Sequence, residues 1–442
     1  VSPEFVPHLY GIAFTLFAVF YSVLGGMLSV VWADVMQYVI MAVSSVIIAV
    51  IAMVTLGEMQ MTVPDGWMSP FFGWNLDIDW SGIYAEVNDK IASDGYSLFS
   101  LVFGLMLFKG ILVSLAGPAP TYDMQKILSA RSPRDAARMS GFVSVALFPV
   151  RFLMIAGVTV LGILLYPEVK EGMTVGSRLD FEQILPVIIK HPVIPVGVTG
   201  ILLAGLLAAF MSTFAGTLNA AQAYIVNDIY CKYIRPDAGR RQVNRANYLS
   251  GIVLVVVSVG FGIFALDVNS VMQWIVSGIY GAYVAANILK WHWWRFNGSG
   301  FAWGMVAGLV PALIFPLVFD VLPLYYFPLI LIISLAGCIA GTYSRPATDM
   351  EVLKTFYTRT RPWGRWKPVL RVVREENPTF CENRNFRRDM GNVFVGIIWQ
   401  LMLVAVPVYF VLKDKMSFAI AVGVLIATSA ILKRTWYDRL ED

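Results

Sequence analysis

Two neighbouring hydroxyl side chains lie in a long apolar segment near the middle of the chain. Residues 204–230 read AGLLAAFMSTFAGTLNAAQAYIVNDIY, which places Ser212 and Thr213 next to each other on an apolar helix. Hard cations prefer oxygen ligands, so this pair has the chemistry needed to help bind a sodium ion. Ser and Thr in such helices also bond back to their own helix or hold two helices together. From these residues alone, ion binding and close helix packing are both open.

Two cations lie inside other apolar segments. Lys109 occurs in LMLFKGILVSLAGPAP, and Arg151 lies at a similar depth in the next apolar run. A charge at the centre of a bilayer costs at least about 2.5 kcal/mol, so each cation needs a partner. The partner is either a buried carbonyl or carboxylate, or a polar or anionic solute in an aqueous cavity.

The segment that contains Lys109 ends in a helix break. Ala116 and Gly117 are followed by Pro-Ala-Pro, and the two prolines remove backbone donors while Gly117 allows a turn. Broken helices at membrane depth are buried or line a cavity, and they often mark the solute site of a transporter. The sequence therefore predicts a solute site next to this break.

The composition places these residues in membrane-spanning helices. Of 442 residues, 58% are hydrophobic and only 14% are charged, with a mean hydropathy of +0.69, whereas soluble domains have about 25% charged residues. No phosphate-binding loop for ATP occurs, and three Cys and three His are too scattered for a metal site. The prediction is an all-α polytopic membrane protein that is not an enzyme.

Eleven apolar runs are long enough to cross about 30 Å of hydrocarbon. They fall at about 7–27, 33–56, 98–118, 139–166, 193–228, 248–266, 270–290, 300–319, 323–343, 391–412 and 416–432. The Gly25-Gly26 pair predicts a tight turn between the first two.

The distribution of Lys and Arg predicts the orientation. Of the 33 cations, 25 lie in alternate loops, which the positive-inside rule assigns to the cytoplasm together with the C-terminus. The cation-rich loops are 119–138, 229–247, 290–299, 344–390 and 433–442. On the opposite side, residues 57–97 form a polar loop with a short helix expected near 81–92. The basic loop 344–390 is expected to lie on anionic headgroups or to bind a partner.

Four stretches resemble the sodium:solute symporter family and occur in its order. Residues 206–236 (LLAAFMSTFAGTLNAAQAYIVNDIYCKYIRP) are similar to its eighth core helix, and 21–37 (YSVLGGMLSVVWADVMQ) to its fourth-to-fifth helix turn. Residues 125–141 (QKILSARSPRDAARMSG) resemble the loop after its broken sixth helix. Residues 293–308 (WWRFNGSGFAWGMVAG) resemble its W-x-R-x-N-x-x-G-x-x-x-G-x-x-x-G signature. The chain is thus identified as a member of that family.

The resemblance implies a leucine-transporter-type fold, with two inverted repeats of five helices and further helices appended. The parts are then core helices four and five (1–56), an outer loop (57–97), core helices six to ten (98–290), an appended helix pair (291–343), a basic cytoplasmic loop (344–390) and a C-terminal helix pair (391–442). Core helices one to three are expected to be missing from this incomplete core. Because helix one supplies part of the sodium site, these residues alone are expected not to transport.

The resemblance also implies roles for single residues. Helix eight of the family gives sodium one carbonyl and two hydroxyls, which fall on Ala209, Ser212 and Thr213. Asp34 matches an acid on helix five near the inner mouth, which implies an ion exit path. The alternative for Asp34 is a surface acid that pairs with inner-loop cations.

For the solute, Gln273 aligns with a glutamine that hydrogen-bonds sugar in the galactose-transporting members. The aromatic pair of those members falls on Ala116 and Gly117, so the stacking platform for a sugar ring is missing. With Lys109 and Arg151 nearby in the predicted helices, a solute with a carboxylate is suggested.

These features predict a sodium-coupled symporter of a sugar, amino acid or carboxylate that works by alternating access. It would be a multi-pass protein of the plasma (inner) membrane. Its partners would be the solute, Na⁺ as coupling ion and the lipid bilayer, with no other cofactor and no nucleic acid; no oligomeric state is predicted. A proton-translocating subunit would need more charged residues at membrane depth, and a channel would need a selectivity filter. A sensor or non-transporting subunit built on a similar domain is the remaining alternative.

Overall fold

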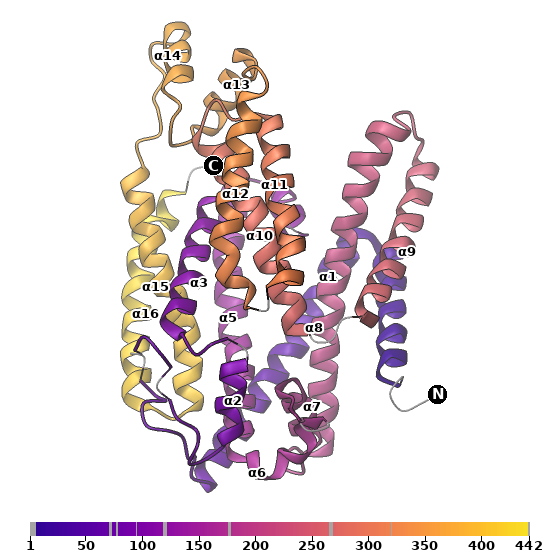
Figure 1. Cartoon of the computed structure of the whole chain (residues 1–442), viewed down its shortest axis with the longest axis vertical. Helices are drawn as coiled ribbons and strands as arrows, with labels where there is room; N and C mark the ends of the chain where they lie inside the picture. Colours follow the sequence, from indigo (N-terminus) through magenta and orange to yellow (C-terminus); the bar gives the residue numbers. More distant parts are fainter. Residues whose placement is uncertain are drawn as a thin grey trace. The chain divides into compact units, whose positions relative to one another are not determined.

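The computed structural model describes residues 6–69, 73–76, 78–93, 95–117, 122–175, 178–264, 268–319 and 321–440. Nearly all of the regular structure is helical, which confirms the predicted all-α class (Figure 1). The chain divides into two compact units. Unit 1 comprises Val1–Thr62, Pro120–Phe264 and Met390–Asp442, and unit 2 comprises Val63–Ala119 and Ala265–Asp389.

Most elements of unit 1 are long helices. In chain order they are α1 (Val6–Glu58), α4 (Tyr122–Leu128), α5 (Pro133–Leu164), α6 (Tyr166–Val169), the 3-10 turn η2 (Glu171–Met173), the paired strands β1 (Thr174–Val175) and β2 (Arg178–Leu179), the 3-10 turn η3 (Phe181–Gln183), α7 (Ile184–Lys190), α8 (Val196–Ala223), its π-helical continuation η4 (Tyr224–Ile234), α9 (Arg240–Phe264), α15 (Phe386–Val411), which begins at the end of unit 2, α16 (Lys415–Thr435) and the 3-10 turn η5 (Tyr437–Arg439).

Unit 2 consists of α2 (Ala85–Ser93), α3 (Phe99–Leu115), α10 (Val268–His292), α11 (Gly298–Val318), α12 (Pro323–Tyr343), α13 (Met350–Thr360) and α14 (Lys367–Glu376). Each of the eleven predicted apolar runs falls on a helix of unit 1 or unit 2. Within the described ranges, eight helices are long and apolar enough to cross a membrane, and two shorter apolar helices lie at Leu9–Val19 and Phe99–Leu115.

The first two predicted helices form the single helix α1. The tight turn expected at Gly25-Gly26 is wrong, because helical structure continues from Val6 to Glu58. Glycine inside a helix costs only about 1 kcal/mol relative to alanine, and apolar helix-compatible residues flank the pair. Figure 1 shows the indigo first part and the violet later part running in different directions. The change of direction is therefore a bend in a continuous helix.

In unit 1, α1 packs closely against α5 and α8. The fully buried Ser44 of α1 donates its hydroxyl to the Ile201 carbonyl of α8 at 2.9 Å. A methyl group added to Gly205 of α8 would overlap the Ser44 side chain. On α5, a methyl group on Gly157 would lie 3.2 Å from the backbone of Ala49. Small residues thus let the backbones of three apolar helices come together, as membrane helices require.

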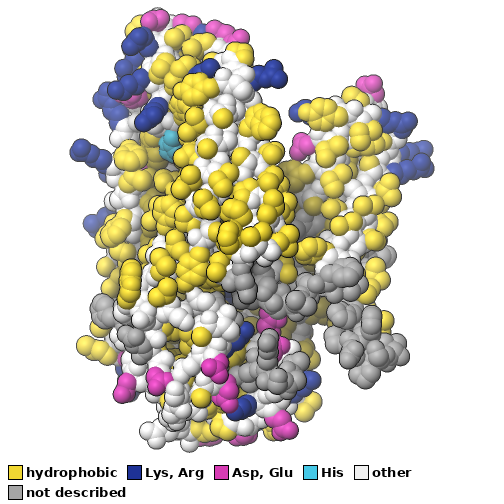
Figure 2. Space-filling view, in the orientation of Figure 1, with side chains coloured by type: hydrophobic (Ala, Val, Ile, Leu, Met, Phe, Trp, Pro, Cys, Tyr) yellow, Lys and Arg dark blue, Asp and Glu magenta, His cyan; other side chains and the backbone are white. Residues whose placement is uncertain are grey.

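In unit 2, α10, α11 and α12 form a bundle. A Cβ on Gly304 would overlap Cys338, and a Cβ on Gly308 would overlap Ala282. The buried Ser334 hydroxyl lies 2.7 Å from the Ala282 carbonyl and 2.9 Å from the Gly304 carbonyl. The regularly spaced glycines of residues 293–308 therefore form a helix-packing surface. Figure 2 shows hydrophobic side chains along α11 and α12, with Lys and Arg gathered at the end that carries α13 and α14.

The polar segment 57–97 contains α2, close to the short helix expected near 81–92. Just before it, the Asp79 carboxylate accepts hydrogen bonds from the Ser81 hydroxyl at 2.6 Å, the Ser81 backbone at 2.9 Å and the Asn88 amide at 2.7 Å. These bonds hold the pKa of Asp79 below its usual value. They tie the segment before α2 to the helix itself.

The basic segment 344–390 is largely helical and has its own core. Its α13 and α14 pack around a cluster of buried side chains: Leu353, Tyr357, Trp366, Val369, Leu370 and Val373. We call residues 350–376 the α13–α14 cap. Its contact with anionic headgroups or with a partner stays a prediction.

Candidate ion and solute sites

Asp34 joins three helices of unit 1. The Ser212 hydroxyl of α8 donates a hydrogen bond to Asp34 Oδ1 at 2.6 Å. The Lys126 ammonium of α4 forms an ion pair with Asp34 Oδ2 at 3.0 Å. The Asp34 side chain, on α1, is only 17% exposed, so little water competes for these bonds. Both predictions for Asp34 are therefore compatible with the structure, because Asp34 contacts a predicted sodium ligand and also an inner-loop cation.

The Ser212 hydroxyl bonds across helices, unlike most hydroxyls described in this unit. Ser45 and Thr55 of α1 donate to carbonyls of their own helix, at Met41 and Ile51. Ser212 instead directs its proton to Asp34. A hydroxyl keeps two lone pairs when its proton is donated, so the Ser212 oxygen can still accept a cation.

The two other predicted sodium residues lie within one turn of Ser212 on α8. Ala209 is half-buried, and Thr213 is exposed. The Thr213 carbonyl accepts a bond from the Thr217 hydroxyl at 2.8 Å. Within the described ranges, the Thr213 hydroxyl has no hydrogen-bond partner, so its oxygen is also available. Their assignment as ligands stays a prediction.

The same helix uses a different set of residues for packing. Gly205 faces Ser44 of α1, and Ala208, Ala215 and Gly216 are buried. The two alternatives raised by the sequence thus apply to different residues of α8. Its small residues serve close packing, and Ser212 serves the polar network.

The break after α3 occurs where the sequence predicts it. The helix ends at Leu115, Ala116 is fully buried, and Gly117 has a φ of +74°, which favours glycine. A Cβ on Gly117 would lie 2.9 Å from Nε1 of Trp291 on α10. The prolines of the break lie outside the described residues. The two predicted solute residues at this break therefore pack within unit 2.

The two cations predicted to lie at membrane depth belong to different units. Lys109 is half-buried on α3 of unit 2, and Arg151 is exposed on α5 of unit 1. Neither side chain has a hydrogen bond or ion pair with any residue that the structure describes. Gln273 lies on α10 of unit 2, and its side chain lies outside the described set. The charged groups of Lys109 and Arg151 are thus available to bind an anionic solute.

Two relevant residues escaped the sequence reasoning. Lys126 lies in the stretch 125–141, but nothing in its spacing indicated Asp34 as its partner. Trp291 precedes the stretch 293–308 and carries no local signal for its contact with Gly117.

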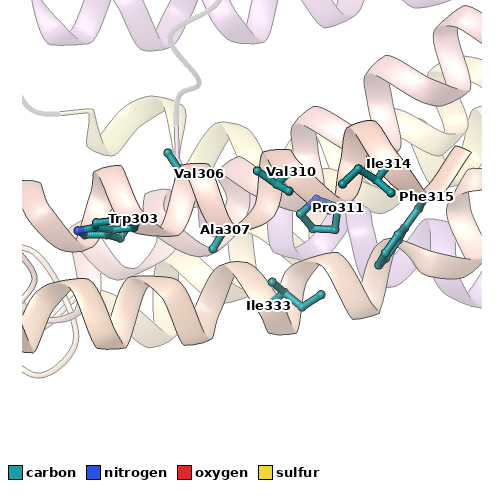
Figure 3. Close-up of a pocket in the computed structure, with 8 residues that line it drawn as sticks. All are labelled: Trp303, Val306, Ala307, Val310, Pro311, Ile314, Phe315 and Ile333. Atoms are coloured by element: carbon teal, nitrogen blue, oxygen red, sulfur yellow. The ribbon is translucent and has the colours of Figure 1, made fainter. Parts of the chain in front are cut away.

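A surface groove between α11 and α12 has a volume of about 450 Å³. Its walls are apolar, and Figure 3 shows them: Trp303, Val306, Ala307, Val310, Pro311, Ile314, Phe315 and Ile333. The groove offers no cluster of oxygen ligands or charges, so it is not a candidate for the ion or for a polar solute.

Comparison with known proteins identifies the class of the chain. Residues 9–308 match the model of the sodium:solute symporter family. A sodium/glucose cotransporter of Vibrio parahaemolyticus is 24% identical over 338 residues, which cover 72% of this chain and 58% of that protein. The high-affinity proline transporter PutP of Bacillus subtilis is 25% identical over 301 residues, which cover 66% and 56%. The chain belongs to the sodium:solute symporter family and is a multi-pass membrane protein.

A solved structure agrees at the level of fold. The chain resembles a Na⁺-coupled sialic acid symporter in its substrate-bound outward-open state, with a TM-score of 0.56 and 16% identity. The match covers 78% of this chain and 69% of that one. This confirms the leucine-transporter-type fold. The chain spans about half the length of the curated relatives it matches.

Proposed function

We propose that this protein is a sodium-coupled symporter that moves a small organic solute by alternating access. The observation that carries the proposal is the bond from Ser212 to Asp34. It places the predicted sodium ligand beside a carboxylate and leaves its oxygen able to accept a cation. The family membership and its transporting relatives support this function.

In this mechanism, Na⁺ binds the Ala209 carbonyl and the hydroxyls of Ser212 and Thr213 on α8. When the ion leaves for the cytoplasm it passes Asp34. The Lys126 ammonium, 3.0 Å from Asp34, competes with the ion for that carboxylate and favours its release. The membrane potential supplies about 2.3 kcal/mol per charge per 100 mV, in addition to the sodium gradient.

The ion site is tested by sodium-dependent uptake in a complete protein that includes core helices one to three, and by binding of ²²Na⁺ to that purified protein. Ser212→Ala and Thr213→Ala should each abolish the sodium dependence and leave the protein folded. Thr217→Ala is the matched control, since its hydroxyl bonds to its own helix and its loss should leave ²²Na⁺ binding unchanged. If uptake by the Ser212→Ala, Thr213→Ala double variant still depended on sodium, the assignment of this ion site would be wrong.

The solute is proposed to bind beside the break after α3 in unit 2, near Ala116 and Gly117, with contributions from Gln273 and Lys109. The solute contact predicted for Arg151, in unit 1, stays a separate proposal. The two cations lack described partners, which favours a solute that bears a carboxylate. Relatives named for glucose and proline transport and a structural neighbour named for sialic acid define a suitable panel.

Thermal-shift measurements in sodium then rank the solutes. N-acetylneuraminic acid, proline and simple carboxylates are compared with glucose and galactose. Stabilisation by an acid that is lost in Lys109→Gln is the expected result. A shift with the sugars and none with the acids would contradict the proposed carboxylate.

The proposed location is the plasma (inner) membrane with a cytoplasmic C-terminus. Cys381 is exposed in the basic segment, whereas Cys338 is buried. In a Cys231→Ser variant, a membrane-impermeant maleimide should label Cys381 in inside-out vesicles only. Labelling in right-side-out vesicles would reverse the orientation.

A further inference from the structure

The C-terminal end of α10 is held by the loop between α13 and α14. The Trp366 indole Nε1 donates to the Trp291 carbonyl at 2.8 Å, and the Arg365 backbone amide donates to the His292 carbonyl at 2.7 Å. The last carbonyls of a helix have no partner within their own helix. The α13–α14 cap therefore completes the hydrogen bonding of α10.

The fit between the loop and α10 is close. Gly364 has a φ of +113°, and a Cβ there would lie 2.8 Å from the His292 Cα. Aromatic rings continue the contact, since the Trp291 ring lies 6.1 Å from the Phe356 ring, which lies 5.4 Å from the Trp366 ring. Trp366 is 4% exposed and belongs to the core of the cap. The position of Trp291 is thus determined by the folded cap.

The other edge of Trp291 meets the break after α3. Its Nε1 lies 2.9 Å, and its Cδ1 and Cε2 lie 3.5 Å, from the position of a Cβ on Gly117. The last turn of α3 is held by two backbone bonds, from Ala116 to Leu112 at 3.0 Å and from Gly117 to Ser114 at 3.3 Å. A shift of the indole ring toward α3 would push directly on this turn.

We propose that Trp291 is a positioning residue for the solute site, and that the α13–α14 cap sets the geometry of the α3 break through it. The functional part rests on the proposed solute site at that break. The coupling itself is a mechanical property of unit 2. Any event that loosens the cap then changes the shape of the break without touching the solute.

Hydrogen exchange of the full chain in lipid nanodiscs tests the coupling without solute or sodium. Trp366→Phe keeps an aromatic ring, although a smaller one, and removes the indole N–H that bonds to the Trp291 carbonyl. The Ala116 and Gly117 amides should then exchange about fivefold faster, the factor expected for the loss of one hydrogen bond. Trp363→Phe is the matched control, because the Trp363 ring packs on Phe386, and it should leave these amides unchanged. Unchanged Ala116 and Gly117 amides in Trp366→Phe would overturn the inference.

The reverse perturbation covers the case in which Trp366→Phe unfolds the cap. Gly117→Ala adds a methyl group against Trp291 and should speed exchange of the Arg365 amide. Gly110→Ala, on the same helix with no atom near its Cβ, should not. An unchanged Arg365 amide in Gly117→Ala also overturns the coupling. Loss of solute-induced thermal shifts with the coupling intact would instead contradict the proposed solute site.

Discussion

The region around Asp34 in unit 1 and the break after α3 in unit 2 are held by different forces. At Asp34, a carboxylate joins a hydroxyl and an ammonium from two other helices. At Gly117, an indole ring packs against a residue that has no side chain. The first contact depends on charge and can be exchanged for another cation. The second contact depends on the volumes of the two groups, so it changes only when one of them is pushed aside. An ion is thus suited to act on the first region and a mechanical force on the second.

The largest effect is expected at Asp34. Asp34→Asn removes the charge that Lys126 and Ser212 share, and each hydrogen bond to a charged group contributes about 1.5–3 kcal/mol. Partial exposure of Lys126 reduces the effect, so the free energy of unfolding should fall by about 3 kcal/mol. Thermal unfolding in detergent measures it. The double variant Asp34→Asn, Lys126→Met should recover part of the loss; additive losses would contradict a coupled network.

The next largest effect is expected at Gly117. Gly117→Ala forces alanine into the left-handed region, at about 1–2 kcal/mol, and crowds Trp291 at a similar cost. The free energy of unfolding should fall by about 2 kcal/mol at any ionic strength. Gly110→Ala should be neutral or slightly stabilising. If added salt shifted the Gly117→Ala loss as much as the Asp34→Asn loss, the contrast between the two regions would not hold.

A smaller effect tests whether unit 1 also contains a contact governed by volume. Gly205→Ala should destabilise by about 1 kcal/mol, because the new methyl group displaces the Ser44 hydroxyl from the Ile201 carbonyl. Adding Ser44→Ala should relieve the overlap at little further cost. A double variant that is less stable than the sum of the single losses would show that Ser44 is not the obstacle.

The smallest effect concerns the charged contacts of the α13–α14 cap. Hydrogen bonds to Glu351 and Glu376 raise the pKa of Lys354 above its usual 10.5. This stabilisation is therefore complete below pH 10.5 and is lost as the pH rises through the higher folded value. Tryptophan fluorescence of the cap should change slightly in that alkaline range. Lys354→Met should abolish this change in fluorescence. If the change persisted in that variant, another titrating group would be its cause.

The helices were predictable because long apolar runs encode them directly. The bend in α1 was mistaken for a turn, since a glycine pair permits either. The helix α13 carried a readable signal, because the Asp349 side chain accepts a bond from the Glu351 amide at its start, yet the abundance of charge favoured a loop. The break after α3 followed from Gly117 and the prolines alone.

The contacts between distant residues were not predictable from spacing. Ser212 and Asp34 are 178 positions apart, and only their separate resemblance to the family placed both near an ion. Trp291 meets Gly117 through the packing of α3 on α10, which no local pattern determines. The sequence thus indicated the candidate site residues, and the tertiary structure defined which residues contact them.

The bond from Ser44 to Ile201 has a kinematic consequence. Its oxygen also lies 2.8 Å from the Ile40 carbonyl, and Gly205 leaves no clearance beside it. A slide of α1 along α8 would have to break this junction, so the contact favours movement of these two helices as one body. If α1 and α8 move as one body, Asp34 and Ser212 keep their hydrogen bond during that movement, so the proposed ion site and its exit residue stay together.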